Sequence, residues 1–219
     1  MSFESSRKEG EIAEQMVIDF FKHNKRTFYD ARNDKLCRHY VIDFITLKNN
    51  YTKEDVLKTI ESCDENEIKE IIEKIGCAIE VKLDKVIHNR HICKNGKLSY
   101  GSRKFVYEII SHNKPGWAAR CRAHYILYFC IDTFDEIAKL SEVYLIDFNK
   151  LKNNLEYFIS NGDAIKKELP YVMEEGVPVK EDIVNYLINI DAMKQKEGVC
   201  KVVTEYFIDF FPKNLHIKK

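Results

Sequence analysis

From residue 79 onward, the stretch IEVKLDK alternates apolar and charged side chains. A β-strand turns successive side chains to opposite faces, so Glu80, Lys82 and Asp84 would share one face while the apolar residues between them are buried. Earlier in the chain a lone acid, Asp43, interrupts a row of apolar residues in the same way. If the two strands are neighbours, Asp43, Glu80 and Lys82 meet in the middle of a sheet, where charge is costly unless it is paired or binds a metal ion.

These residue types suit the metal-assisted hydrolysis of a phosphodiester bond. Mg²⁺ prefers oxygen ligands, keeps several waters and typically takes one or two carboxylates together with substrate phosphate. Asp43 and Glu80 would supply the carboxylates, and Val81 could offer its backbone carbonyl. Lys82 could orient the attacking water or stabilise charge that develops on the phosphate. The second role is favoured, because a lysine with an ordinary pKa of about 10.4 stays protonated.

A third acid comes from the beginning of the chain. Ser6 and Glu9 have the spacing of a capping box, and the apolar residues that follow predict a helix at about 7–23. On this helix Glu14 lies at the margin of the apolar face, whereas Glu11 is expected to point toward water. Glu14 is therefore placed to look into a cleft, where it could help to hold a water of the metal ion or a second ion.

The elements predicted around these residues form one mixed sheet flanked by helices, which is an α/β or α+β fold. Strands are expected at 27–31, 39–47, 77–86, 124–131, 143–148 and about 201–210, the first two as a β-hairpin across the polar turn at 32–35. Helices are expected at about 7–23, in two pieces within 52–75, and at 117–122, 149–159 and about 180–193. Asn95-Gly96 is a further hairpin signal.

This ordered set resembles the PD-(D/E)XK, or restriction-endonuclease-like, nuclease superfamily. The resemblance rests on Glu14 in the opening helix, on VID ending at Asp43 and on EVK with Glu80 and Lys82, and it covers about residues 7–131. It implies an αβββαβ core, Asp43, Glu80 and Lys82 as the catalytic set, Glu14 as an accessory acid, and Mg²⁺ or Mn²⁺ as cofactor. Ile42 replaces the proline of the motif, a substitution that the superfamily tolerates.

A single domain spanning 1–219 is expected, with a helical insertion at about 50–76 and a C-terminal extension at about 143–219. Net charge is zero, but residues 85–125 carry nine Lys and Arg against one acid, which favours a phosphate-facing surface. In this superfamily the helix after the E-x-K strand often borders the nucleic-acid groove. The resemblance therefore implies nucleic-acid contacts from this segment: Arg103, Lys104, Lys114, Trp117, Arg120 and Arg122. For Trp117, packing against the core is the favoured alternative.

The expected function is a metal-dependent endonuclease or exonuclease that hydrolyses DNA, with RNA not excluded, in phage, mobile-element, repair or restriction processes. By analogy with many relatives it could form a homodimer. The main alternative is a catalytically inactive nuclease-fold module that binds nucleic acid or protein. In a third interpretation the acidic helices within 52–75 contact a basic partner. His88, His91 and Cys93 could bind zinc, but no second Cys/His pair lies nearby.

Other classes of protein lack support in the sequence. The longest apolar stretch, 125–131, is far shorter than the roughly 20 residues of a membrane-spanning helix, and the N-terminus is too charged for a secretory signal. Seven cysteines, an odd number without a paired pattern, indicate reduced thiols and a cytoplasmic location. No phosphate-binding glycine loop or serine-nucleophile motif is present, so ATP-driven, dinucleotide and serine-hydrolase chemistry are not indicated.

Overall fold

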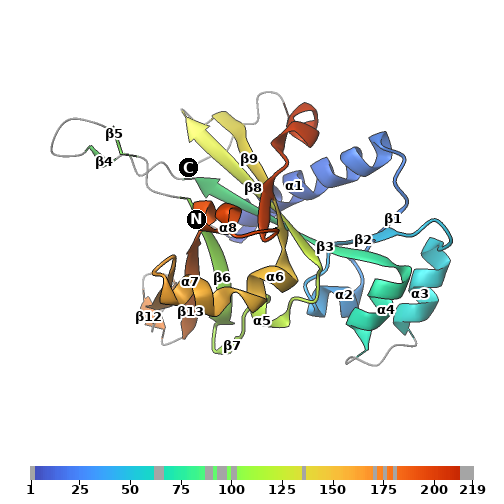
Figure 1. Cartoon of the computed structure of the whole chain (residues 1–219), viewed down its shortest axis with the longest axis horizontal. Coiled ribbons are helices and arrows are strands. Elements are labelled where there is room, and N and C mark those ends of the chain that lie inside the picture. The colour runs from blue at the N-terminus through green and yellow to red at the C-terminus, as the bar shows by residue number, and fades with distance from the viewer. Residues whose placement is uncertain are drawn as a thin grey trace.

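A computed structural model describes residues 3–61, 67–86, 91–92, 98–99, 103–134, 137–169, 172–174, 177–179 and 182–212. The fold is mixed α/β, with a mixed central sheet flanked by helices, as the sequence predicts (Figure 1). Among the described residues, no helix is both long and apolar enough to cross a membrane. The residues of the zinc alternative and of the Asn95-Gly96 turn lie outside the described residues, except for the backbone of His91.

The central sheet has six strands in the order β1-β2-β3-β8-β9-β14. Its strands are β1 (Phe28–Asp30), β2 (Phe44–Leu47), β3 (Gly76–Val86), β8 (Tyr125–Phe134), β9 (Ile137–Asp147) and β14 (Cys200–Val202). Neighbours are antiparallel except β3 and β8, which are parallel. A parallel pair needs a crossover, and the chain returns from β3 to β8 by way of β6, β7 and α5.

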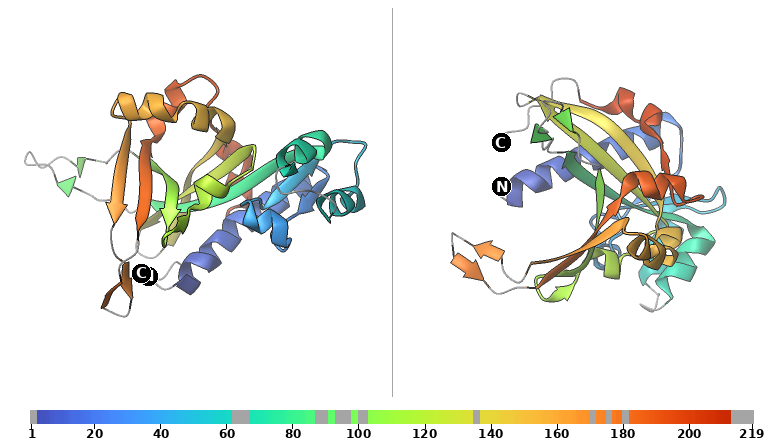
Figure 2. Two further views of the ribbon diagram at one scale, coloured as in Figure 1. Left: turned by 90° about the horizontal axis from the view of Figure 1, so that it is seen from below. Right: turned by 60° about the vertical axis from the view of Figure 1, so that its left-hand side comes forward.

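Helix α1 (Phe3–His23) covers one face of this sheet (Figure 2). Its apolar stripe packs on alternate residues of β3 and β8, and the 3₁₀ turns η1 (Thr204–Tyr206) and η2 (Ile208–Phe210) lie against the same cluster. The buried members of this layer include Ala13, Met16, Val17, Phe21, Val81, Phe129 and Phe207. The predicted amphipathic helix is thus confirmed, with Glu14 at the edge of its buried face, but it begins at Phe3 and not after a capping box at Ser6.

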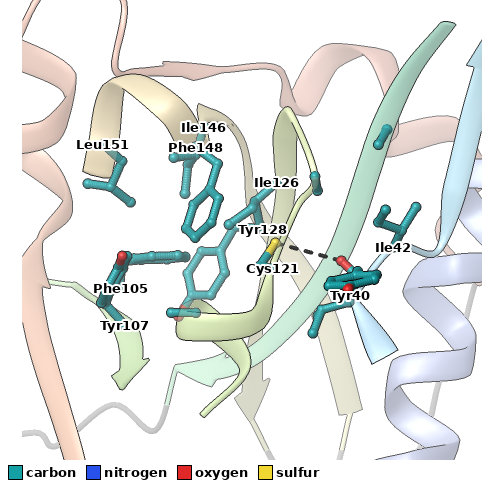
Figure 3. Packing of buried hydrophobic residues seen from close by; sticks show 14 of the residues in the cluster. Tyr40, Ile42, Phe105, Tyr107, Cys121, Ile126, Tyr128, Ile146, Phe148 and Leu151 are labelled. Carbon is teal, nitrogen blue, oxygen red and sulfur yellow. Dashed lines mark hydrogen bonds between the residues drawn. The ribbon is translucent and has the colours of Figure 1, made fainter. Parts of the chain in front are cut away.

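The opposite face packs against a second, four-stranded sheet with the order β10-β13-β6-β7 and against short helices. The strands are β6 (Lys104–Ser111), β7 (Lys114–Pro115), β10 (Ala164–Leu169) and β13 (Ile183–Asn189). The helices are α5 (Trp117–Arg120), α6 (Phe148–Asn153), α7 (Leu155–Ser160) and α8 (Ile190–Gln195). Figure 3 shows how Phe105 and Tyr107 of β6 meet Tyr128 of β8 and Phe148 of α6 in this layer.

The two helices predicted within 52–75 are present as α3 (Lys53–Glu61) and α4 (Ile68–Ile75). Their apolar residues Val56, Ile60, Ile68, Ile72 and Ile75 are buried in the main cluster, so the insertion packs on the core. Two-stranded ribbons complete the described elements: β4 (His91–Ile92) with β5 (Leu98–Ser99), and β11 (Val172–Glu174) with β12 (Val177–Val179).

The strand predicted at 39–47 is wrong in its first half. Residues Lys35–His39 form the helix α2, and β2 begins only at Phe44. Asp34 accounts for the helix, because its side chain caps the N-terminus by accepting a 2.8 Å hydrogen bond from the amide of Cys37. The strands β1 and β2 do pair antiparallel, but α2 replaces the predicted tight turn between them.

Three predictions for the second half of the chain also need correction. The helix predicted around 180–193 is mainly the strand β13, which pairs with β6 and β10, and only its end is the helix α8. The strand predicted at 201–210 is short β14 followed by two 3₁₀ turns, and the helix at 149–159 divides into α6 and α7 at Asn154. Strands β6 and β10 were not predicted.

Candidate active site

Asp43 and Glu80 lie near each other where β2 meets β3. The antiparallel register ends with Phe44 opposite Ile79, and Asp43 and Glu80 are the residues next to this last pair. The charge of Glu80 acts on Asp43, so the two side chains are close in space. Both side chains line one pocket. The structure thus brings together the two acids that the sequence pattern places on neighbouring strands.

Three hydrogen bonds fix Asp43 between the end of β1 and the edge of β3. Its amide donates to the carbonyl of Ile79 at 3.0 Å, its carbonyl accepts from the amide of Ala31 at 2.9 Å, and its Oδ2 accepts from the amide of Val81 at 2.8 Å. The amide and carbonyl of one strand residue point to the same edge, so the carbonyl of Val81 faces Asp43 as well. The side chain of Val81 is buried against α1, as its predicted anchoring role requires.

Glu80 is the buried charged residue of the described chain, with only 3% of its surface exposed. Its Oε1 accepts a hydrogen bond from Nζ of Lys82. Its Oε2 is buried and has no hydrogen-bond partner among the described residues. A buried carboxylate oxygen without a partner is costly, and binding a cation is one way to remove that cost.

Lys82 lies on the same face of β3 two residues later. Its Nζ sits 5.1 Å from the centre of the Trp117 ring, close enough for a cation–π contact. Burial lowers the pKa of Lys82, but the charge of Glu80 and the hydrogen bond to it outweigh burial, so the pKa lies above its ordinary value. Lys82 therefore remains a cation, which favours charge stabilisation over a role as general base.

Glu14 reaches the same pocket from α1 and is held by Arg32. The Nη1 of Arg32 lies 2.7 Å from Oε2 of Glu14, while its Nη2 and Nε contact Asp30 at 2.7 and 2.8 Å. The guanidinium also sits 5.3 Å from the centre of the Phe44 ring. Glu14 is therefore in the pocket, as the helical wheel predicts, with its charge compensated. Glu11 is exposed as predicted, but it too lines the pocket.

The pocket has a volume of about 810 Å³ and lies between α1, the segment from β1 to β2, and the edge of β3. Its charged lining comes from three parts of the chain: α1, the segment between β1 and β2, and β3. These residues are Glu11, Glu14, Arg32, Arg38, Asp43, Glu80 and Lys82. Acids and cations thus line one cleft together. Such a cleft can accept a ligand that combines a divalent cation with phosphate groups.

The pKa of Asp43 is perturbed by its buried surroundings. Burial, and then the negative charge of Glu80, raise the pKa of Asp43 to about 8, although the amide of Val81 and the charge of Lys82 act in the opposite direction. The ionised form of Asp43 is therefore disfavoured when no cation is bound. A divalent cation between the two acids would favour the ionised form.

The oxygen donors present suit Mg²⁺ or Mn²⁺, although the protein supplies only a few ligands. Across the described ranges, no group of three or more His, Cys, Asp or Glu side chains is placed to hold a metal ion. Mg²⁺ does not require such a group, because it commonly binds one or two carboxylates and retains waters. Asp43 and Glu80, with the carbonyl of Val81, would make up the protein's share.

Of the nucleic-acid contacts predicted on and just after α5, Trp117 lies near Lys82, and none lines the pocket. Trp117 is half-buried and stacks on Phe148 at 6.0 Å between ring centres, so it packs against the core, the alternative favoured by the sequence. Arg120 donates to the carbonyl of His39 at 3.0 Å, and Arg122 donates to three carbonyls of residues 119–121 at 3.3 Å each. Both arginines thus fasten the end of α5, and their nucleic-acid contact stays a prediction.

The remaining predicted contacts lie on β6 and β7. Arg103, just before β6, is ion-paired with Glu142 and donates to Ser141, so its charge is already compensated. Lys104 is half-buried at the start of β6, and Lys114 is exposed in β7. None of these three lines the pocket with Asp43 and Glu80.

Arg32 and Arg38 are two pocket cations that the sequence pattern does not predict. The polar pattern of residues 32–35 predicts a tight turn, and the clustered Lys and Arg residues after residue 85 predict the phosphate contacts elsewhere. Asp34, three residues before Cys37, is a helix-capping signal that could have revealed α2. Two arginines flanking this cap, just before the strand of Asp43, could then have been assigned to the same cleft.

Comparisons with known proteins found no matching family model, no matching curated protein and no matching solved structure. A functional assignment therefore depends on the residues of this pocket and on their geometry.

Proposed function

We propose that the protein is a metal-dependent nuclease that hydrolyses phosphodiester bonds in DNA, with its active site at Asp43, Glu80 and Lys82. The observation that carries the proposal is the pairing of two carboxylates across β2 and β3, with a lysine ammonium beside them in an open pocket. Paired acids of this kind are expensive for a fold and are retained where they bind a cation.

Each residue has a distinct task in this proposal. Asp43 and Glu80 hold the cation, which is Mg²⁺ or Mn²⁺, and Val81 presents its carbonyl at the same edge. The cation supplies Lewis-acid activation of the phosphate and of the attacking water. Lys82, held protonated by Glu80, stabilises negative charge that develops on the phosphate oxygens. Glu14, compensated by Arg32, is an accessory acid at the rim.

The order of the elements supports a restriction-endonuclease-like core. An opening helix, three antiparallel strands, a crossover that contains α5 and a strand parallel to the third follow one another from α1 to β8. This order is compatible with the αβββαβ arrangement that the PD-(D/E)XK resemblance implies, with Asp43 just before the second strand and Glu80 on the third. Strands β6 and β7 within the crossover and helices α3 and α4 are additions to that arrangement.

The decisive experiment is cleavage of supercoiled plasmid, duplex, branched and single-stranded DNA, and of RNA, in the presence of Mg²⁺, Mn²⁺ or EDTA. The wild-type protein should nick or degrade at least one substrate with Mg²⁺ or Mn²⁺ and none in EDTA. Lys82→Ala should lower the turnover number by about 10²- to 10³-fold, because one preorganised charge-stabilising group is lost. Asp43→Asn and Glu80→Gln should abolish metal-dependent cleavage.

Lys201→Ala is the matched control, since Lys201 is an exposed lysine on β14 at the other end of the sheet. Its activity should equal that of the wild type. Equal activity of Lys82→Ala and Lys201→Ala would exclude the proposed site. Binding of DNA by the wild type without any metal-dependent cleavage would favour the non-catalytic module instead.

A further inference from the structure

The three cations that line the pocket differ in whether their charge is already compensated. Lys82 is paired with Glu80 on the floor of the pocket. Arg32 is paired with both Glu14 and Asp30, so two carboxylates share its guanidinium. Both side chains therefore already have carboxylate partners in the absence of a ligand.

Arg38 is different. It lines the same pocket from α2, and its side chain is exposed. Its guanidinium forms no hydrogen bond or ion pair with any described residue. A guanidinium presents a planar fork of donors that matches phosphate oxygens. Arg38 is therefore the pocket cation that a ligand phosphate can engage without competing with a described carboxylate.

The short helix that carries Arg38 is held in place at its beginning. The side chain of Asp34 caps the amide of Cys37 at 2.8 Å, and Cys37 itself is fully buried in the main cluster. Because Arg38 directly follows this anchored residue, its backbone position is fixed by the core even though its side chain reaches solvent.

The helix is held equally firmly at its end. Val41 has a φ of 55°, an unfavourable left-handed conformation for a β-branched residue, and its carbonyl accepts a hydrogen bond from Sγ of Cys121 at 3.6 Å (Figure 3). Two residues later, Asp43 is hydrogen-bonded to the edge of β3 at Ile79 and Val81. This constrained turn therefore sets Arg38 at a fixed position relative to the metal-binding acid.

We propose that Arg38 is a phosphate-binding residue of the active-site pocket, which contacts the nucleic-acid backbone next to the phosphodiester bond held at Asp43 and Glu80. The identification of the ligand as nucleic acid rests on the proposed function. The volume of about 810 Å³ supports it, because this is room for a ligand of nucleotide size or larger and not for one isolated phosphate. If Arg38 contacts a phosphate of the nucleic acid, the substrate strand passes along α2.

The test is equilibrium binding of a short labelled duplex DNA and of the same labelled single strand, in EDTA so that no cleavage occurs. Arg38→Ala should weaken binding several-fold, and the slope of log K against log salt concentration should fall by about one, as for the loss of one phosphate contact. Arg38→Lys keeps the charge but not the planar fork and should lie between the two proteins. Arg26→Ala, at an exposed arginine outside the pocket, is the charge-matched control and should bind like the wild type.

The outcomes separate this inference from the proposed function. An unchanged affinity and salt slope in Arg38→Ala, an equal loss in Arg26→Ala, or no DNA binding by the wild type would each overturn the role of Arg38. If the wild type binds through Arg38 but never cleaves with Mg²⁺ or Mn²⁺, the phosphate contact stands and the nuclease assignment fails. If it cleaves and Arg38→Ala binds as tightly, the reverse holds.

Discussion

At the scale of single residues, the candidate site is marked by buried carboxylates whose charge is not fully compensated. Glu80 has one oxygen paired with Lys82 and one buried without a described partner, and its charge acts on the nearby Asp43. A chain under selection for stability alone would place apolar residues here, because burying a carboxylate pair costs free energy. The cost is recovered when a cation binds, so the unliganded site should show it in measurable ways.

The first prediction concerns the pH dependence of stability. The pKa of Asp43 is raised from 3.8 to about 8, so the folded chain binds this proton more tightly than the unfolded chain. Its stabilising contribution is complete below the unfolded value and is lost as the pH rises through the folded value. In EDTA the free energy of unfolding of the wild type, measured by urea denaturation, should therefore fall between about pH 4 and pH 8 relative to Asp43→Asn.

The substitution is a clean probe, because the asparagine Oδ1 can still accept the hydrogen bond from the amide of Val81. Mg²⁺ favours the ionised carboxylate, so saturating Mg²⁺ should stabilise the wild type most at the upper end of this range. Parallel stability curves for the two proteins in EDTA would contradict the environment assigned to Asp43.

A second prediction separates Glu14 from its partner. Glu14 adds negative charge near Asp43, and Arg32 neutralises it. Removing the cation with Arg32→Gln should therefore tighten Mg²⁺ binding, whereas Glu14→Gln should weaken it, each by roughly fivefold, which corresponds to about 1 kcal/mol for a partly exposed charge. Calorimetric titration with Mg²⁺ measures both. A shift in the same direction for the two variants would show that the pair acts by packing and not by charge.

At the scale of elements, the local apolar pattern predicts the secondary structure correctly where the apolar face of a segment is also the face that is buried. Strict alternation predicted β3, and helical periodicity predicted α1, α3 and α4, because each buries a single continuous face. The apolar residues at 183–189 led to a wrong helix prediction, because a short apolar run is compatible with both a strand and a helix. Its pairing with β6 and β10, which are distant in sequence, decided for the strand.

The same distinction holds for the candidate site. Asp43, Glu80 and Lys82 were found because their alternation and spacing survive in the sequence. Arg32 and Arg38 were missed because only the turn of the chain through α2 brings them into the pocket. A side chain whose position depends on a helix cap and a left-handed residue leaves little periodic signal.

A third prediction tests whether the register of β2 and β3 controls the site. Gly76 starts β3 opposite Leu47, and a Cβ there would lie 2.0 Å from the carbonyl oxygen of Thr46. Gly76→Ala must push the strands apart, so the free energy of unfolding should drop by about 1–3 kcal/mol. Metal-dependent stabilisation should shrink as well. Gly10→Ala, where an added Cβ meets nothing within 4 Å, should instead be neutral or stabilising in urea denaturation.

At the scale of the whole molecule, helix α1 and the 3₁₀ turns η1 and η2 pack together on one face of the central sheet. Phe207, 3% exposed, lies 4.8 Å from Phe20 of α1 and 5.2 Å from Phe129 of β8, measured between ring centres. The hydrophobic cluster on the opposite face also combines distant parts of the chain, because it contains buried residues of α3, α4, α6 and α8. The segments predicted as an insertion and an extension therefore contribute to the same core as the strands of the site.

The last prediction follows from this shared layer. Phe207→Ala should lower the free energy of unfolding by about 3 kcal/mol, because it removes a buried aromatic ring between α1 and β8. If the C-terminal turns brace the helix that presents Glu14, amide hydrogen exchange should accelerate along α1, measured under native conditions. Ile208→Ala, at a neighbouring side chain that is 57% exposed, should change neither quantity appreciably. Unchanged exchange in α1 of Phe207→Ala would mean that the helix is held by the sheet alone, and that the C-terminal turns cover it without supporting the site.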